Sequence, residues 1–335
     1  MLSPSTIDSI NFLAKQINIY FGLFILILGI IGGLINIIIF TTLKTFRKTS
    51  CAFYLSMASI FNVGELISGA FTTILNIGFD IDPTELSYLC KIRMFLVQWF
   101  GLLSVTSMCL ASIDQFLLVK YQYLTSLKLA ISFITIACLI WSIHGIFFVL
   151  FWNSIDGVCS ITNITFDMYI TYFHFPILLG FLPLTIMILC SFPAFINARK
   201  LASRQINIIR LSCDRQLTAM TLSQIAFIVI TTIPFITTYI FLLNMKSTDK
   251  EYNARMYLVH TITTYVYYTT YANSFYIYCF VSKRFRKQFI YVLINVHLQR
   301  YNQQRNRLNN NQVQPTKVGT SIEQIPKKND EIALY

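Results

Sequence analysis

The sequence predicts an all-α membrane protein: a bundle of seven transmembrane helices followed by a short amphipathic eighth helix. The chain of 335 residues is 55% hydrophobic and only 12% charged, whereas soluble domains carry about 25% charged residues. Seven apolar stretches follow one another, each long enough for the roughly 20 helical residues that cross a bilayer core. The alternating ten-residue strands of a membrane β-barrel are not seen. The expected spans are 17–43, 50–78, 91–119, 128–152, 168–197, 217–243 and 256–281.

The basic residues predict how these spans are oriented. If the N-terminus lies outside, 20 of the 26 lysines and arginines fall in inner loops or in the C-terminal tail. Loops rich in lysine and arginine stay on the cytoplasmic side of a membrane. We therefore expect a plasma-membrane protein with an extracellular N-terminus and a cytoplasmic C-terminus. The net charge of +12 lies on loops beside an anionic leaflet, so the bilayer is an expected partner and nucleic acid is not.

The chain divides into three expected parts. Residues 1–16 are polar and lack the basic and apolar regions of a cleavable signal peptide, so we expect a short extracellular N-terminus. Residues 17–290 form the seven-helix domain, and its eighth helix is predicted where Phe285 and Phe289 share one face between basic residues. Residues 291–335 are rich in asparagine and glutamine and are expected to be a disordered cytoplasmic tail.

The cysteines and one sequon depend on this topology. Of eight cysteines, only Cys90 and Cys159 fall on the outer side, where disulfides persist. Two cysteines allow one pairing, so we expect a disulfide between the second outer loop and the start of the third span. The sequon Asn163-Ile164-Thr165 falls on the same side, and Asn163 is a predicted glycosylation site.

The third span carries the first resemblance to a known family. It ends in the segment Ile113–Val119, which reads IDQFLLV, and Cys90 lies 25 residues before Gln115. Both features resemble the third helix of rhodopsin-like G-protein-coupled receptors, in which an Asp-Arg-Tyr motif closes the helix. The resemblance covers residues 17–290 and looks closest to invertebrate neuropeptide receptors of the FMRFamide type. Further matches occur in family order at Asn36, Trp141, Pro183, Pro234 and Tyr278.

The resemblance implies a receptor that senses an extracellular ligand and activates a heterotrimeric G protein. Two residues depart from the family pattern: Gln115 replaces the motif arginine, and Asn62 replaces an aspartate that normally holds sodium. Since a neutral glutamine cannot form an ion pair, we expect a weaker inactive state and raised basal signalling or altered coupling. The residues implied in the activation switch are Asn36, Asn62, Asp114, Gln115, Asp214, Pro234 and Tyr278.

Glu65 is the one acid deep inside a span, and charged groups at that depth usually have a function. It is either the anchor for a cationic ligand group or a protonated or hydrogen-bonded carboxyl that lines a wet cavity. Amine receptors of this family carry an aspartate at the position of Val97, and opsins carry the retinal lysine at the position of Tyr268. The resemblance therefore disfavours amine and retinal ligands. The acidic outer loops favour a basic or amidated peptide. The positions implied in the ligand pocket are Glu65, Val97, Gln98, Gly101, Phe235, Tyr239, His260, Thr264 and Tyr268.

Other classes of function have less support in the sequence. The four histidines lie in different segments without the spacing of metal ligands, so we expect no catalytic site, metal or cofactor and no enzyme. Transporters are usually built from internal repeats with broken helices, and no repeat is seen. The competing hypothesis is a seven-helix membrane binding protein or chemoreceptor that does not couple to G proteins.

Overall fold

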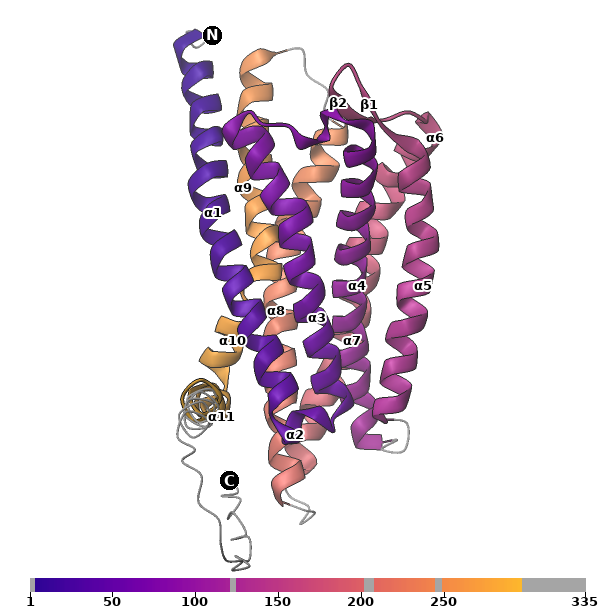
Figure 1. The fold of residues 1–335 in the computed structure, drawn as a ribbon, viewed down its shortest axis with the longest axis vertical. Coiled ribbons are helices and arrows are strands. Elements are labelled where there is room, and N and C mark those ends of the chain that lie inside the picture. The colour runs from indigo at the N-terminus through magenta and orange to yellow at the C-terminus, as the bar shows by residue number, and fades with distance from the viewer. Residues whose placement is uncertain (1–3, 121–124, 202–207, 245–248, 297–335) are drawn as a thin grey trace, which may run out of the picture.

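The computed structural model describes residues 4–120, 125–201, 208–244 and 249–296. Long helices run side by side between the two ends of one bundle (Figure 1). A β-hairpin lies at one end, which we call the hairpin end, and the helix α11 lies across the bundle axis near the other, which we call the α11 end.

The described helices correspond closely to the predicted spans. The first four spans are α1 (Pro4–Thr42), α3 (Ser50–Glu65) with the π-helical segments η1 (Leu66–Phe71) and η2 (Ile74–Gly78), α4 (Ser87–Lys120) and α5 (Leu127–Phe151). The fifth predicted span corresponds to α6 (Ile164–Tyr169) continued by η5 (Ile170–Phe181) and α7 (Leu182–Leu201). The sixth corresponds to α8 (Ile208–Asn244), and the seventh to α9 (Lys250–Ala272) with α10 (Ser274–Val281). The short elements are α2 (Lys44–Arg47), η3 (Pro83–Glu85), α11 (Lys283–Tyr291) and η6 (Val292–Val296).

Six of the described helical segments are long and apolar enough to cross a membrane, which identifies a multi-pass membrane protein. The expected seventh span, 256–281, is not among them, because tyrosine, threonine and histidine lower the hydropathy of α9. This helix nevertheless packs against α1 and α8 along the bundle. The seventh crossing stays a prediction. The polar residues 4–16, expected to form a separate N-terminus, continue α1 as one helix.

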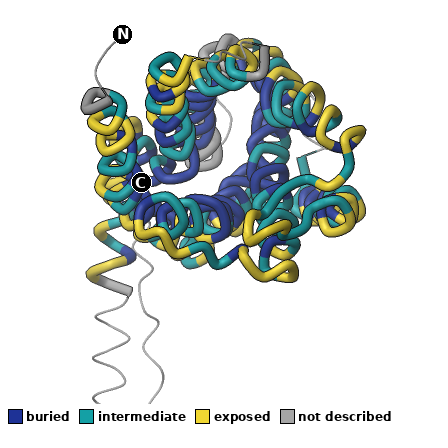
Figure 2. The backbone as a smooth tube through the Cα atoms, turned by 90° about the horizontal axis from the view of Figure 1, so that it is seen from above, coloured by how far each residue is buried: buried dark blue, intermediate teal, exposed yellow. Residues whose placement is uncertain are grey.

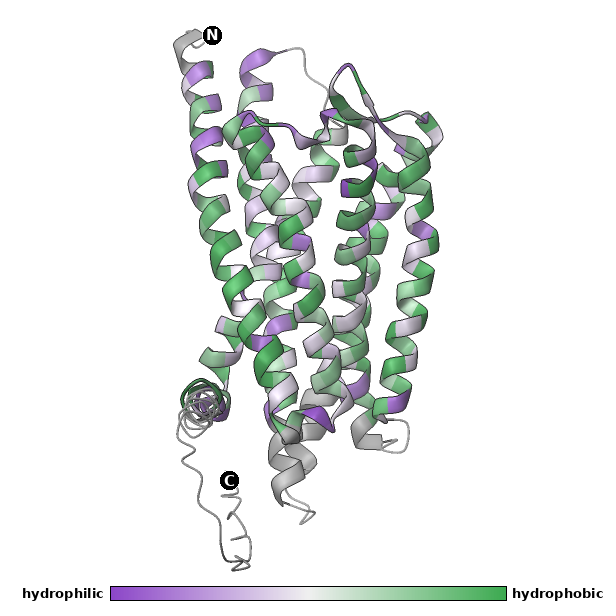
Figure 3. Ribbon diagram, viewed as in Figure 1, coloured by the Kyte–Doolittle hydropathy of each residue, from purple (hydrophilic) through white to green (hydrophobic). Residues whose placement is uncertain are grey.

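The outward surface of the bundle suits a lipid environment. Viewed along the bundle, buried positions face the interior and exposed positions face outward (Figure 2). Apolar residues, drawn in green, cover most of the helices between the two ends (Figure 3). Hydrophilic residues, drawn in purple, are more frequent near the two ends. On α5 most of the exposed side chains are apolar, including Ile136, Leu139, Ile143 and Leu150. A soluble protein rarely exposes a continuous apolar surface of this size.

The predicted disulfide is confirmed. Cys90 of α4 and Cys159 are bonded, with their Cα atoms 5.6 Å apart. Cys159 belongs to an antiparallel hairpin of β1 (Trp152–Ile155) and β2 (Val158–Ile161), which the all-α prediction did not include. The turn residues Asp156 and Gly157 both have positive φ, as a two-residue type I′ turn requires. The disulfide therefore fastens this hairpin to the first turn of the third span.

Glycines allow α1 to approach its neighbours closely. A Cβ atom on Gly29 would lie 2.4 Å from the Leu66 side chain and 2.8 Å from that of Ala272. Gly29 thus lies where α1 meets both the second span and α9. By contrast, a Cβ atom on Gly101 of α4 would meet its nearest neighbour at 3.7 Å, an ordinary contact.

Replacing Gly29 with alanine is therefore expected to lower the free energy of unfolding by about 1–3 kcal/mol, the usual cost of overpacking a core. Gly101→Ala is the matched control, because alanine fits there and is a better helix former than glycine by up to about 1 kcal/mol. Thermal unfolding of the purified protein in detergent measures both. Equal melting temperatures for the two variants would contradict the close approach of α1.

Candidate functional site

Glu65 lies inside the bundle, towards the hairpin end, at the point where α3 gives way to π-helical η1. The side chain is 4% exposed, and its Oε2 atom makes no hydrogen bond with any described residue. A Cβ atom on Gly69 would lie 2.9 Å from both the Glu65 Oε1 and the Tyr268 Oη atoms. A Cβ atom on Gly101 would lie 3.7 Å from Oε2 and 3.8 Å from the Tyr271 Oη. The carboxyl group therefore lies between two tyrosine hydroxyls and against two glycines.

An aromatic wall continues from these tyrosines. The hydroxyl groups of Tyr267 and Tyr271 are hydrogen-bonded at 2.6 Å. The Tyr267 ring stacks on Phe235 of α8 with 4.6 Å between the centroids, and Phe235 in turn contacts Tyr239 and His260. Five aromatic residues thus extend from the buried carboxyl group across α9 to α8.

Arg93 lies nearer the hairpin end, on the second turn of α4. It is half-buried, and its Nε and Nη2 atoms donate to the Thr72 and Thr73 hydroxyls at 2.7 and 3.1 Å. An arginine has five N–H donors, so this guanidinium retains donors beyond those used by the two threonines.

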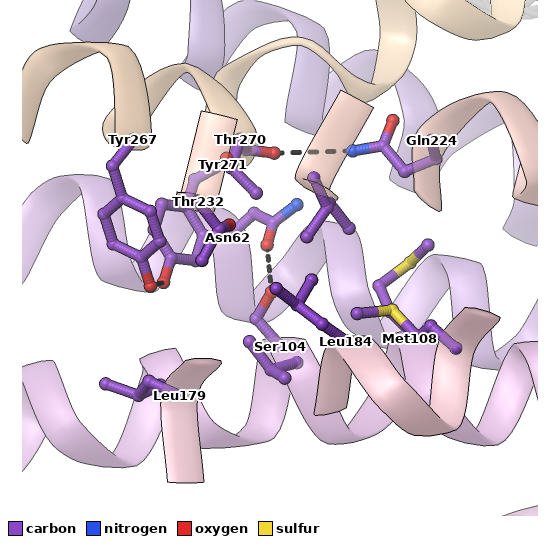
Figure 4. Close-up of a pocket in the computed structure, with 13 residues that line it drawn as sticks. Asn62, Ser104, Met108, Leu179, Leu184, Gln224, Thr232, Tyr267, Thr270 and Tyr271 are labelled. Atoms are coloured by element: carbon purple, nitrogen blue, oxygen red, sulfur yellow. Dashed lines mark hydrogen bonds between the residues drawn. The ribbon is translucent and has the colours of Figure 1, made fainter. Parts of the chain in front are cut away.

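A small cavity lies next to the tyrosine pair, and Tyr267 and Tyr271 are among the residues that line it (Figure 4). About 20 Å³ of it is accessible to a water molecule, which is room for about one ordered water. Ser104 donates to the Asn62 Oδ1 atom at its edge, and Gln224 Nε2 donates to the Thr270 carbonyl at 3.4 Å. None of the residues that line it is acidic. The cavity is therefore uncharged, and its lining is mostly apolar with a few polar groups.

A second polar cluster occupies the α11 end. Asp114 accepts a hydrogen bond from Ser50 at 2.6 Å, and Thr218 of α8 donates to Gln115 Oε1. The Gln115 Nε2 atom has no partner among the described residues. The side chain of Asp214, the expected acid at the base of the sixth span, lies outside the described residues. Gln115 therefore joins α4 to α8 through an uncharged hydrogen bond.

The other predicted switch residues are buried at contacts between helices. Asn36 Nδ2 donates to the Ser274 hydroxyl at 3.0 Å, which joins α1 to α10. Tyr278 packs edge-on against Phe40 and Phe285. Pro234 lies inside α8, where a proline leaves the preceding turn without one backbone hydrogen bond.

The predicted ligand-pocket residues do not form one cluster. Gln98 points towards α5, where its Nε2 donates to the Trp141 carbonyl at 3.2 Å and its Oε1 contacts His144 Nδ1 at 2.9 Å. Val97 is half-buried, and the buried Thr264 hydroxyl has no partner among the described residues. Glu65, Gly101 and Tyr268 lie together, and Phe235, Tyr239 and His260 form the aromatic wall.

The sequence interpretation missed several residues of the site. Tyr267, Tyr271 and Arg93 were not assigned to the pocket, although positions 267, 268 and 271 follow the spacing of one helix face. It also treated the histidines as unrelated, but the rings of His144 and His174 stack 5.5 Å apart. Among the described residues, no group of three or more metal-ligating side chains occurs.

The predicted glycosylation site has a structural role as well. The Asn163 Oδ1 atom accepts hydrogen bonds from the backbone N–H groups of Thr165 and Phe166 and so caps α6. These bonds use the oxygen of the amide and not the nitrogen that carries a glycan. Glycosylation of Asn163 stays a prediction.

No protein-family model matches this sequence, and no curated protein is significantly similar to it.

Proposed function

We propose that this chain is a seven-helix G-protein-coupled receptor that binds an extracellular ligand and activates a heterotrimeric G protein. The hairpin end would face outside and the α11 end the cytoplasm, in accord with the distribution of lysine and arginine. A basic or amidated peptide is the favoured ligand, because the expected outer loops are acidic and Glu65 is a buried acid inside the bundle.

The observation that carries the proposal is the course of α4. Near its middle, Gly101 lies against Glu65; four turns further on, Gln115 is bonded to Thr218 of α8. One helix thus lies against a buried carboxyl group near the middle of the bundle and is hydrogen-bonded to α8 nearer the α11 end. A ligand that prefers one arrangement of α4 and α8 would shift the population between two states of the protein.

The hydrogen bond between Gln115 and Thr218 is expected to hold the inactive state weakly. A neutral hydrogen bond contributes about 1 kcal/mol, so its loss should change the population ratio about fivefold. Thr218→Val keeps the size of the side chain and removes the hydroxyl; we expect basal G-protein activation to rise about fivefold. Cell assays over a panel of G-protein classes measure this, with surface expression confirmed. Thr237→Val is the control, because that hydroxyl bonds only to the backbone of α8.

Gln115→Arg tests the same function from the other side. An arginine could form an ion pair with Asp114, so we expect it to increase the signal gained on stimulation by basic and amidated peptides. Silence from wild type and Gln115→Arg with every G protein, at normal surface expression, would favour the alternative. That alternative is a membrane binding protein or chemoreceptor that does not couple to G proteins.

A further inference from the structure

Glu65 and Arg93, two groups of opposite formal charge, lie on neighbouring helices of the bundle without forming an ion pair. Within the described part of the chain, neither Glu65 nor Arg93 has an oppositely charged group at ion-pair distance. Burying a charge without a partner costs free energy, so an arrangement of this kind suits a ligand that supplies the missing charges.

The position of Arg93 is fixed by the second span. Thr72 and Thr73, which accept its hydrogen bonds, follow Glu65 by seven and eight residues. At about 1.5 Å per helical residue, the guanidinium lies roughly 10 Å from the Glu65 backbone towards the hairpin end. Its Nη1 atom donates to no described residue. A donor is therefore available to a group that approaches from that end.

The space between Glu65 and Gly101 would admit a group about the size of a methyl, at ordinary contact distance. The Glu65 Oε2 atom is unpartnered, and Gly101 presents no side chain in front of it. The hydroxyls of Tyr268 and Tyr271 flank the carboxyl group. A hydroxyl can either donate or accept, so both can serve a cationic nitrogen bound there. Arg93 and Tyr268 are only half-buried, which places the deeper Glu65 behind a partly open approach.

We propose that the ligand is zwitterionic: a cationic nitrogen binds the Glu65 carboxylate between the Tyr268 and Tyr271 hydroxyls, and a carboxylate binds Arg93. A ligand that carries only a positive charge would leave Arg93 without an acidic partner. Its cation would also be repelled by Arg93 on the way to Glu65. This inference rests on the proposed receptor function and narrows its ligand class. Among basic peptides, it favours those with a free carboxylate near the basic group over amidated ones.

Three five-carbon probes separate the two charges: 5-aminopentanoic acid carries both, pentylamine only the cation and pentanoic acid only the anion. The measurement is the probe concentration that gives half of the maximal thermal stabilisation of the full chain in lipid nanodiscs. Charge-assisted hydrogen bonds contribute about 1.5–3 kcal/mol each, which corresponds to at least a tenfold change in affinity. We expect the amino acid to act at concentrations at least tenfold lower than either single-charge probe.

Charge-removing variants assign each half of the probe. In Glu65→Gln the amino acid should act no better than pentanoic acid, and in Arg93→Gln no better than pentylamine. Gly101→Ala, which places a methyl group 3.7 Å from Oε2, should weaken the amino acid and the amine but not the acid. Glu251→Gln and Arg255→Gln are the matched controls, because this ion pair lies on α9 near the hairpin end; both should respond as wild type.

Two results would overturn the inference: stabilisation by pentylamine equal to that by the amino acid, or no stabilisation by any of the three probes. The binding measurement uses no G protein. Intact probe binding without G-protein activation would therefore remove the proposed function alone, whereas peptide activation without probe binding would remove this inference alone.

Discussion

Cys159→Ser is expected to lower the free energy of unfolding by roughly 4 kcal/mol. The disulfide to Cys90 closes a loop with a sequence separation of 69, and in the chain-entropy model a loop of this length stabilises the folded state by about that amount. The hairpin would also lose its disulfide link to α4. Thermal unfolding with and without reductant measures the effect, together with surface expression in cells.

Cys138→Ser is the control for this prediction, since Cys138 of α5 is a free cysteine. Its melting temperature should stay close to that of wild type and should not respond to reductant. If reductant left the wild-type melting temperature unchanged, the covalent link would not contribute to stability in the way we expect.

Phe285→Ala is expected to cost about 3–5 kcal/mol, the usual result of truncating a fully buried phenylalanine. The side chain is 0% exposed and contacts Phe40, Phe275 and Tyr278. Its backbone N–H also donates a hydrogen bond to the Ser282 hydroxyl, which caps the start of α11. The substitution should therefore loosen α11 from the bundle as well as lower the melting temperature of the purified protein.

Phe280→Ala provides the comparison, because Phe280 lies on the preceding helix α10 and is 87% exposed. A change at an exposed position usually stays within about 0.5 kcal/mol. Equal losses for Phe280→Ala and Phe285→Ala would show that the aromatic cluster does not hold α11 in place.

The spans and the disulfide could be predicted because each depends on one strong signal. A bilayer requires long apolar stretches, and only two cysteines fall on the predicted outer side. The crossing of α9 could not be established in this way, since its tyrosines and threonines lower its hydropathy although they face other helices. Hydropathy reports composition and does not report which side of a helix meets lipid.

The candidate site was harder to predict than the spans. Glu65 was identified because an isolated acid inside a span is unusual. Its neighbours Tyr267 and Tyr271 depend on how α9 is rotated against α3, which one sequence does not specify. The orientation of Gln98 could not be predicted for a similar reason: adjacent helical positions differ by about 100° around the axis, and in the structure this amide donates to the Trp141 carbonyl.

The contact between α8 and α11 has a mechanical consequence. Gln216 Nε2 donates to Gln288 Oε1 at 3.1 Å, and both side chains are buried. If the N-terminal end of α8 moved away from the bundle, either the hydrogen bond between Gln216 and Gln288 would break or α11 would move with α8. α11 carries basic residues beside exposed apolar ones, as helices that bind a membrane surface do. The lipid composition of the leaflet that α11 contacts would therefore change the free-energy cost of moving the α8 terminus.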